Sequence, residues 1–190
     1  MRIRARLSRL YRRFAASTRG VAAIEFAMIL PVLAVLFLGS FDGGRAIAIY
    51  LKVRAATYAL ASITNQYQTI ALSDMQSITA ATAVIMQPYP SAPAVVTISQ
   101  IAINGKGTAT VAWSYSLNGT PLTQGASFTL PSANLATPNS YLIYAQVGYA
   151  FTPMFGYFTA GTINFSDYLF ITPRSSTCII YTPETGASCA

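Results

Sequence analysis

An apolar segment directly after an arginine-rich arm constrains this chain more than any other feature. Residues 21–41 form a run of 21 residues that holds one charged side chain, Glu25. As a helix the run is about 31 Å long, which matches the hydrocarbon core of a bilayer. Its twelve Val, Ile, Leu and Phe residues favour insertion by roughly 4–7 kcal/mol, and a carboxylate near one end costs less than about 3 kcal/mol. The segment is therefore predicted to span a membrane.

The positive charge of the chain lies in the N-terminal arm. Residues 1–20 hold seven arginines and no acid, whereas residues 21–190 hold five basic and five acidic residues. Because flanking Lys and Arg stay on the cytoplasmic side, we expect a cytoplasmic N-terminus and an outer C-terminal region. The neutral body argues against nucleic-acid binding, which uses basic residues spread over a folded surface. A secretory signal peptide is the rival interpretation, but the apolar run exceeds the usual 7–15 residues and contains a glutamate.

Two helices are expected from the spacing of apolar residues. The first covers residues 21–66, about 69 Å, with a weak point at Gly43-Gly44 and a transmembrane kink at Pro31. The second begins with Ser73 as N-cap, carries an acid in its first turn, and ends at Met86 before two prolines.

The remainder of the chain alternates with a period of two, which indicates strands. A loop is expected over residues 118–139, a hairpin turn over residues 104–107, and a bulge at a phase slip in Ser99-Gln100. A second phase slip lies near Asp167. The predicted architecture is an α+β domain in which one long and one short helix accompany a four-stranded antiparallel sheet of two hairpins, with strands near residues 94–103, 109–117, 141–151 and 163–171.

The sequence holds little of the chemistry that catalysis needs. It contains no histidine, which excludes a Ser-His-Asp arrangement and the commonest metal ligand. The outer region has three acids, Asp74, Asp167 and Glu184, widely separated in sequence, and it lacks a phosphate-binding glycine loop. We therefore expect no enzyme activity, no cofactor, no metal and no small-molecule substrate.

The two cysteines, Cys178 and Cys189, enclose ten residues near the C-terminus. In an oxidising compartment outside the membrane they are expected to form a disulfide, which would stabilise this short loop by about 2–3 kcal/mol. Two free thiols in a frayed terminus are the alternative.

A glycine at the border of the arm and the apolar run, followed five residues later by a lone acid, resembles a type IV prepilin leader. Over residues 19–62 the chain resembles the TadE-like family of the tight-adherence (Tad/Flp) pilus system. That family shows G-x-A-x-[IV]-E-F-A, then a proline in an apolar run, then a Gly-Arg pair. The matching residues here are Gly20, Ala22, Glu25, Phe26, Ala27, Pro31 and Gly44-Arg45.

The resemblance implies a minor pilin-like (pseudopilin) structural protein that assembles a Tad/Flp type IV pilus. The major pilins of the system tend to be shorter and to have Glu-Tyr where this chain has Glu25-Phe26, and TadG-like relatives usually carry a larger outer domain. Prepilin peptidase would cut after Gly20, and the new amine of Val21 would pair with Glu25 of a neighbouring subunit. Alternatively, Glu25 reaches the headgroups or pairs with Arg19.

The expected organisation has three parts: a basic cytoplasmic leader (1–20), a transmembrane helix and stalk (21–66), and a periplasmic α+β domain (67–190). The expected partners are the bacterial inner membrane, crossed once, prepilin peptidase, other pilin-like subunits and the Tad assembly platform; the protein could also join the pilus.

The alternative function is an uncleaved, membrane-anchored binding module outside the membrane. Exposed aromatic side chains would favour it, and burial of those rings between helix and sheet would favour the pilin interpretation. The aromatic residues in question are Tyr141, Tyr144, Tyr149, Phe155, Tyr157 and Phe158.

Overall fold

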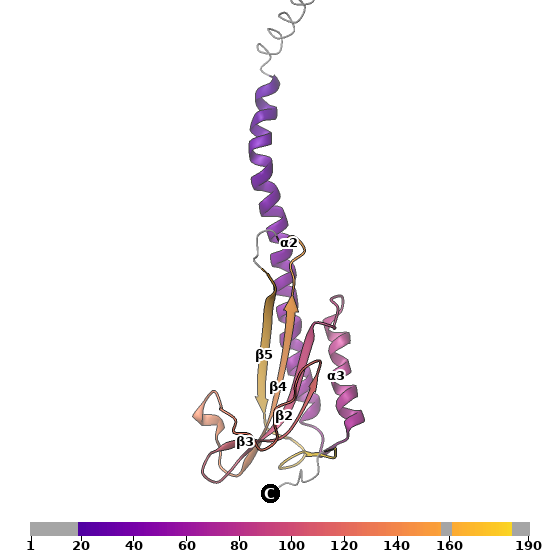
Figure 1. Ribbon diagram of the computed structural model, residues 1–190, viewed down its shortest axis with the longest axis vertical. Helices are drawn as coiled ribbons and strands as arrows, with labels where there is room; N and C mark the ends of the chain where they lie inside the picture. Colours follow the sequence, from indigo (N-terminus) through magenta and orange to yellow (C-terminus); the bar gives the residue numbers. More distant parts are fainter. Residues whose placement is uncertain (1–18, 157–160, 184–190) are drawn as a thin grey trace, which may run out of the picture. The chain divides into compact units, whose positions relative to one another are not determined.

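The structure, a computed structural model, describes residues 19–156 and 161–183. The chain divides into two compact units, one up to Gly43 and one from Gly44 onward (Figure 1). The boundary falls within helix α2, Arg19–Thr64, at the glycine pair that the sequence marks as a weak point.

Helix α2 is the first element of the described chain and runs for 46 residues. It continues through Pro31, where the predicted kink stays a prediction, and through both glycines of the pair. Its end at Thr64 lies two residues before the predicted end. Turn hydrogen bonds from the amides of Asn65 and Gln66 to the carbonyls of Ala61 and Ile63 close the helix there.

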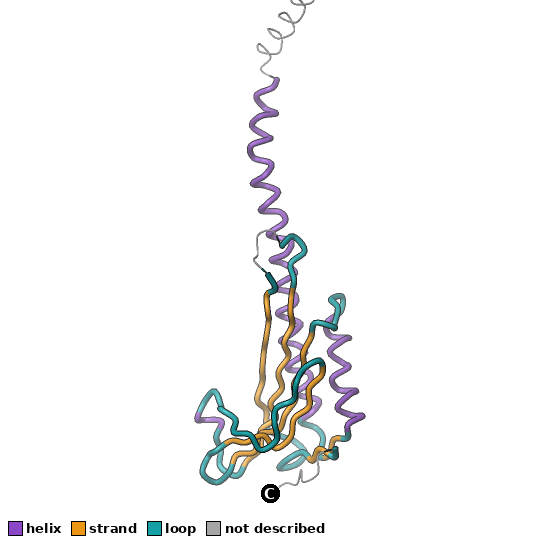
Figure 2. The backbone as a smooth tube through the Cα atoms, in the orientation of Figure 1, coloured by secondary structure: helices purple, strands orange, loops and turns teal. Residues whose placement is uncertain are grey.

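A four-stranded antiparallel sheet is the centre of the second unit, which confirms the predicted α+β class (Figure 2). The order across the sheet is β3-β2-β4-β5, so the two hairpins lie side by side through β2 and β4. The strands are β2 (Ala94–Ile103), β3 (Ala109–Leu117), β4 (Ser140–Phe151) and β5 (Ile163–Ile171).

The first hairpin turn forms at residues 104–107, as predicted. The side-chain oxygen of Asn104 accepts hydrogen bonds from the amides of Lys106 and Thr108, both at 2.9 Å. Gly107 has a φ of 78°, a left-handed conformation that glycine adopts without strain.

The predicted irregularity in the first hairpin is present, but the neighbouring strand supplies the extra residue. Strand β2 pairs with β4 continuously from end to end. Its register with β3 shifts between Gln100 and Ile101, where Ala112 of β3 is passed over. The apolar residues of β2 change phase because Ile98 and Ile101 face opposite sides of the sheet and both sides are buried.

Strand β5 pairs with β4 without any register shift, so the phase change near Asp167 is not a bulge. The change has the same cause as in β2: Phe165 packs against the main core on one face of the sheet, and Phe170 packs against a second apolar cluster on the other face.

Helix α3, Leu72–Met86, corrects the predicted N-cap. The N-cap is Ala71, not Ser73, which lies inside the first turn. A side-chain cap is absent at Ala71, but the carboxylate of Asp74 accepts a hydrogen bond from the Ala71 amide at 3.0 Å. The acid from within the first turn therefore satisfies a terminal amide and complements the helix dipole.

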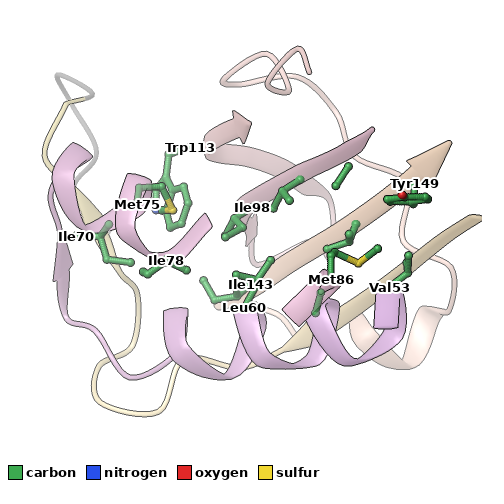
Figure 3. Packing of buried hydrophobic residues seen from close by; sticks show 14 of the residues in the cluster. Val53, Leu60, Ile70, Met75, Ile78, Met86, Ile98, Trp113, Ile143 and Tyr149 are labelled. Atoms are coloured by element: carbon green, nitrogen blue, oxygen red, sulfur yellow. The ribbon is translucent and has the colours of Figure 1, made fainter. Parts of the chain in front are cut away.

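The main core lies between the two helices and one face of the sheet (Figure 3). The C-terminal part of α2 and helix α3 supply apolar side chains that are fully buried against β2, β3 and β4. The ammonium of Lys52 on α2 donates a 3.0 Å hydrogen bond to the carbonyl of Ile85 on α3, which joins the two helices. The labelled members of this core are Val53, Leu60, Ile70, Met75, Ile78, Met86, Ile98, Trp113, Ile143 and Tyr149.

A second, two-stranded sheet was not predicted from the sequence. Strand β1, Thr69–Ile70, pairs in parallel with β6, Ile180–Tyr181, from the C-terminal segment. Two buried side chains of the main sheet hold the same segment through Ile179. The Trp113 indole N–H donates to the Ile179 carbonyl at 2.8 Å, and the Ile179 amide donates to the Gln100 side-chain oxygen at 2.7 Å.

Candidate functional site: the N-terminal part of helix α2

The predicted processing and assembly residues all lie in the first two turns of α2. Gly20, Val21, Glu25 and Phe26 are helical and exposed. Val21 and Glu25 are four residues apart, so they lie on the same face of the helix, about one turn from each other. The Val21 position and the Glu25 carboxylate therefore face the same side of the helix.

The steric surroundings of Gly20 are open. A Cβ atom added there would meet no other atom within 4 Å, and the same holds for Gly39 and Gly43. Nothing in the packing of the described chain therefore requires glycine at position 20. A requirement for glycine at this position would have to come from outside the folded chain.

The side chains that follow are apolar and uncovered. Only α2, among the helices that the structure describes, is long and apolar enough to cross a membrane, and its most apolar stretch is not buried against other parts of the protein. Water would make this exposure costly, at about 25 cal/mol for each Å² of apolar surface. The large exposed side chains are Val21, Ile24, Phe26, Met28, Ile29, Leu30, Val32, Leu33, Val35, Leu36, Phe37 and Phe41.

The aromatic residues whose burial or exposure distinguishes the pilin interpretation from the binding-module interpretation differ in burial. Tyr149 is 5% exposed in the main core, where its hydroxyl donates a 3.0 Å hydrogen bond to the carbonyl of Pro90. Burial raises the pKa of Tyr149, and the nearby Arg45 guanidinium opposes that rise. Tyr141, Tyr144 and Phe155 are half-buried, and Tyr157 and Phe158 lie outside the described residues.

The structure also brings together an aromatic cluster that the sequence pattern does not predict. Tyr144 on β4 meets Phe170 and Tyr168 on β5, with ring centroids 5.1 and 6.3 Å away, and Phe128 from the connection between β3 and β4 at 5.2 Å. These rings lie on the face of the sheet away from the main core. The alternation of β5 could have revealed Tyr168 and Phe170, but Phe128 stands in a stretch with no period.

The acids of the outer region form no metal-binding cluster within the described residues. Among residues 19–156 and 161–183, no group of three or more His, Cys, Asp or Glu side chains could hold a metal ion. Asp74 serves as the helix-start acceptor described above, and Asp167 lies within the β4–β5 pairing. Glu184 lies outside the described residues.

The predicted disulfide involves one described residue. Cys178 is 2% exposed, next to the segment held by Trp113 and Gln100, while Cys189 lies outside the described residues. The pairing of the two cysteines stays a prediction.

An exposed apolar N-terminal helix joined to an α+β unit fits the class of membrane-anchored proteins. Residues 20–62 match the family model described as TadE-like protein, which confirms the resemblance seen in the sequence. TadE-like proteins form a structural, pilus-associated family, and the similarity to it covers residues 20–62 of the 190-residue chain. No curated protein and no solved structure matches this chain.

Proposed function

We propose that this protein is a minor pilin-like subunit of a Tad/Flp pilus, cleaved by prepilin peptidase between Gly20 and Val21. The observation that carries the proposal is the TadE-like segment, residues 20–62, which begins at the proposed scissile bond and continues as a helix whose large apolar side chains are exposed as far as Phe41. In this proposal the helix crosses the bacterial inner membrane once, with the N-terminus in the cytoplasm and the α+β unit in the periplasm.

Cleavage would change the charge of the protein strongly. The seven arginines of residues 1–20 account for the whole net charge of +7, so the mature chain would be neutral. Each basic residue near an anionic membrane surface contributes roughly 1 kcal/mol of attraction. Loss of the arm would therefore ease withdrawal of the helix into an assembly with other subunits.

Glu25 would then find its partner in the assembly. A carboxylate in apolar surroundings is costly unless a positive group pairs with it. The new α-amino group of Val21 on a neighbouring subunit supplies that charge, since both groups lie near the same end of the helix. The partners in this proposal are pilin-like subunits and the Tad assembly platform.

The experiment is N-terminal sequencing of the protein from membranes of cells with an active prepilin peptidase. The wild-type protein is expected to begin at Val21, whereas Gly20→Val is expected to retain Met1 and stay in the membrane fraction. Because a Cβ at position 20 meets nothing in the fold, the variant tests recognition by the peptidase.

Gly39→Val is the matched control, since it makes the same change in the same helix, also in open space. It should be processed like the wild type. A wild-type protein that begins at Met1 would overturn the proposal and favour the uncleaved anchored binding module. A first residue beyond position 41 would instead indicate a secretory signal peptide.

A further inference from the structure

A groove lies on the face of the main sheet away from the main core. The floor consists of Tyr144, Tyr168 and Phe170 on β4 and β5, and residues 128–131 form the side. The wall is fixed at its start, because the amide of Phe128 donates a 2.9 Å hydrogen bond to the carbonyl of Ala109 on β3. The volume of this open groove is about 240 Å³.

The rings of the groove floor pack against one another, and one of them, Tyr168, is also exposed to solvent. Tyr168 packs against Tyr144 and Phe170, with centroids 6.3 and 5.9 Å away, yet it is 52% exposed. Its neighbours hold the ring in place, so a ligand that stacks on it would not have to order a mobile side chain.

A chain of uncharged polar groups borders the same rings. The Tyr144 hydroxyl donates to the Gln146 side-chain oxygen at 2.8 Å, and the Gln146 amide nitrogen donates to the Ser166 hydroxyl at 3.1 Å. Gln146 is also the cross-strand partner of Tyr168. Ser166 therefore keeps its own hydroxyl proton to donate, and Gln146 keeps a second amide proton and an acceptor lone pair.

The groove is also free of charge. None of the described residues that line it is charged, and neither is Gln146 or Ser166 beside it. Asp167 lies between Ser166 and Tyr168 on β5, so its side chain points to the opposite face of the sheet. Its main-chain carbonyl accepts a hydrogen bond from the Thr57 hydroxyl of α2. A phosphorylated or nucleic-acid ligand would find no counter-charge in this part of the protein.

We propose that this groove binds a neutral saccharide, one sugar ring at a time, stacked on Tyr168 and hydrogen-bonded to Gln146 and Ser166. A sugar ring combines an apolar face with hydroxyl groups that both donate and accept, which matches rings beside an amide and a hydroxyl. The volume of the groove lies below the roughly 300–1,000 Å³ of sites for drug-sized ligands and suits a single ring. A proline-rich segment also stacks on aromatic rings, but it offers only acceptors to this network.

The test uses the full chain in nanodiscs made from lipids without sugar headgroups. Neutral tetrasaccharides of glucose, mannose and N-acetylglucosamine are titrated by saturation-transfer NMR, beside a nonaproline peptide. At least one saccharide is expected to bind saturably, with a Kd near 1 mM or below. Tyr168→Ala should weaken that binding about tenfold or more, and Gln146→Ala should weaken it to a smaller degree.

Tyr58→Ala is the matched control, because Tyr58 on α2 is a tyrosine of similar exposure, 65%, outside the groove. It should bind like the wild type, and thermal unfolding should show that all three variants are folded. The proposal is overturned if no saccharide binds at about 10 mM, if Tyr168→Ala binds like Tyr58→Ala, or if only the proline peptide depends on Tyr168. It does not rest on cleavage after Gly20, so either proposal can fail alone.

Discussion

Replacing Gln100 with leucine tests how the C-terminal segment is held to the domain. Gln100 is 2% exposed, and its side-chain oxygen accepts the Ile179 amide at 2.7 Å. Leucine fills a similar volume but has no acceptor, so a buried N–H loses its partner. Leaving such a group unsatisfied costs about 1–3 kcal/mol.

The cost should appear first as local opening of the C-terminal segment. Strand β6 pairs with β1 over two residues only, so its hold on the domain depends on the bonds to Ile179 and on the burial of Ile179 and Tyr181. A loss of about 1–3 kcal/mol raises the open population by roughly 5- to 150-fold. The amides of Ile180 and Thr182 donate to β1 and its preceding residue, so their exchange with deuterium reports this opening directly.

Two measurements follow the change in the full-length protein. Hydrogen exchange at Ile180 and Thr182 should accelerate by the factor given above. Fluorescence should also respond, because Trp113 is the single tryptophan, donates to the carbonyl of Ile179, and has its ring centroid 5.3 Å from that of Tyr181.

The control is Gln76→Leu on an exposed position of α3, which makes the same substitution without removing a side-chain bond of the core. It should leave exchange in β6 unchanged. If Gln100→Leu and Gln76→Leu give the same exchange rates at Ile180 and Thr182, the reasoning about the Ile179 amide is wrong.

Three further predictions concern the helix, the C-terminal segment and the aromatic cluster. Glu25→Gln should preserve membrane insertion, because a neutral amide costs less in lipid, but should reduce co-purification with pilin-like partners; unchanged co-purification and normal surface pili would refute the pairing role. Cys178 and Cys189 should resist thiol alkylation in protein from cells under non-reducing conditions, whereas full labelling of both would exclude the disulfide. Burial and then the nearby Tyr168 phenol raise the pKa of Tyr144 above 10; the folded state therefore holds the proton more tightly, and the resulting stability is present below pH 10 and lost as pH rises through the raised pKa. Tyr144→Phe should flatten this alkaline fall in melting temperature, and an equally steep fall would show that another group causes it.

Much of the fold could be predicted because its signals are local. The β3 strand was visible as an alternation from Ala109 to Leu117, and its observed bounds are the same. Helix α2 was visible from its apolar content, and the TadE-like segment from residues close together in the chain. Such patterns depend on the period of a helix or strand and need no knowledge of distant residues.

The errors arose where one local pattern has two physical causes. The phase change in β2 predicts a bulge in that strand, but both faces of β2 are buried and the passed-over residue, Ala112, belongs to β3. Residue type predicts Ser73 as the N-cap, whereas the observed N-cap is Ala71, whose amide donates to the Asp74 carboxylate. In both cases the observed structure depends on a contact that the local pattern does not record: the pairing of β2 with β3, and the hydrogen bond between Ala71 and Asp74.

The sequence by itself determined the apolar helix, the glycine and glutamate at its start, the second helix and the four strands of the main sheet. The tertiary structure alone decided that Ile179 is held between Gln100 and Trp113, 79 and 66 residues away in sequence, and that Phe128 meets Tyr144 and Phe170 beside a groove. The physical reason is that periodicity records only which side of an element is apolar. The partner of each buried polar group, and the rings that gather on a second face, are set by pairing between segments that are distant in the chain.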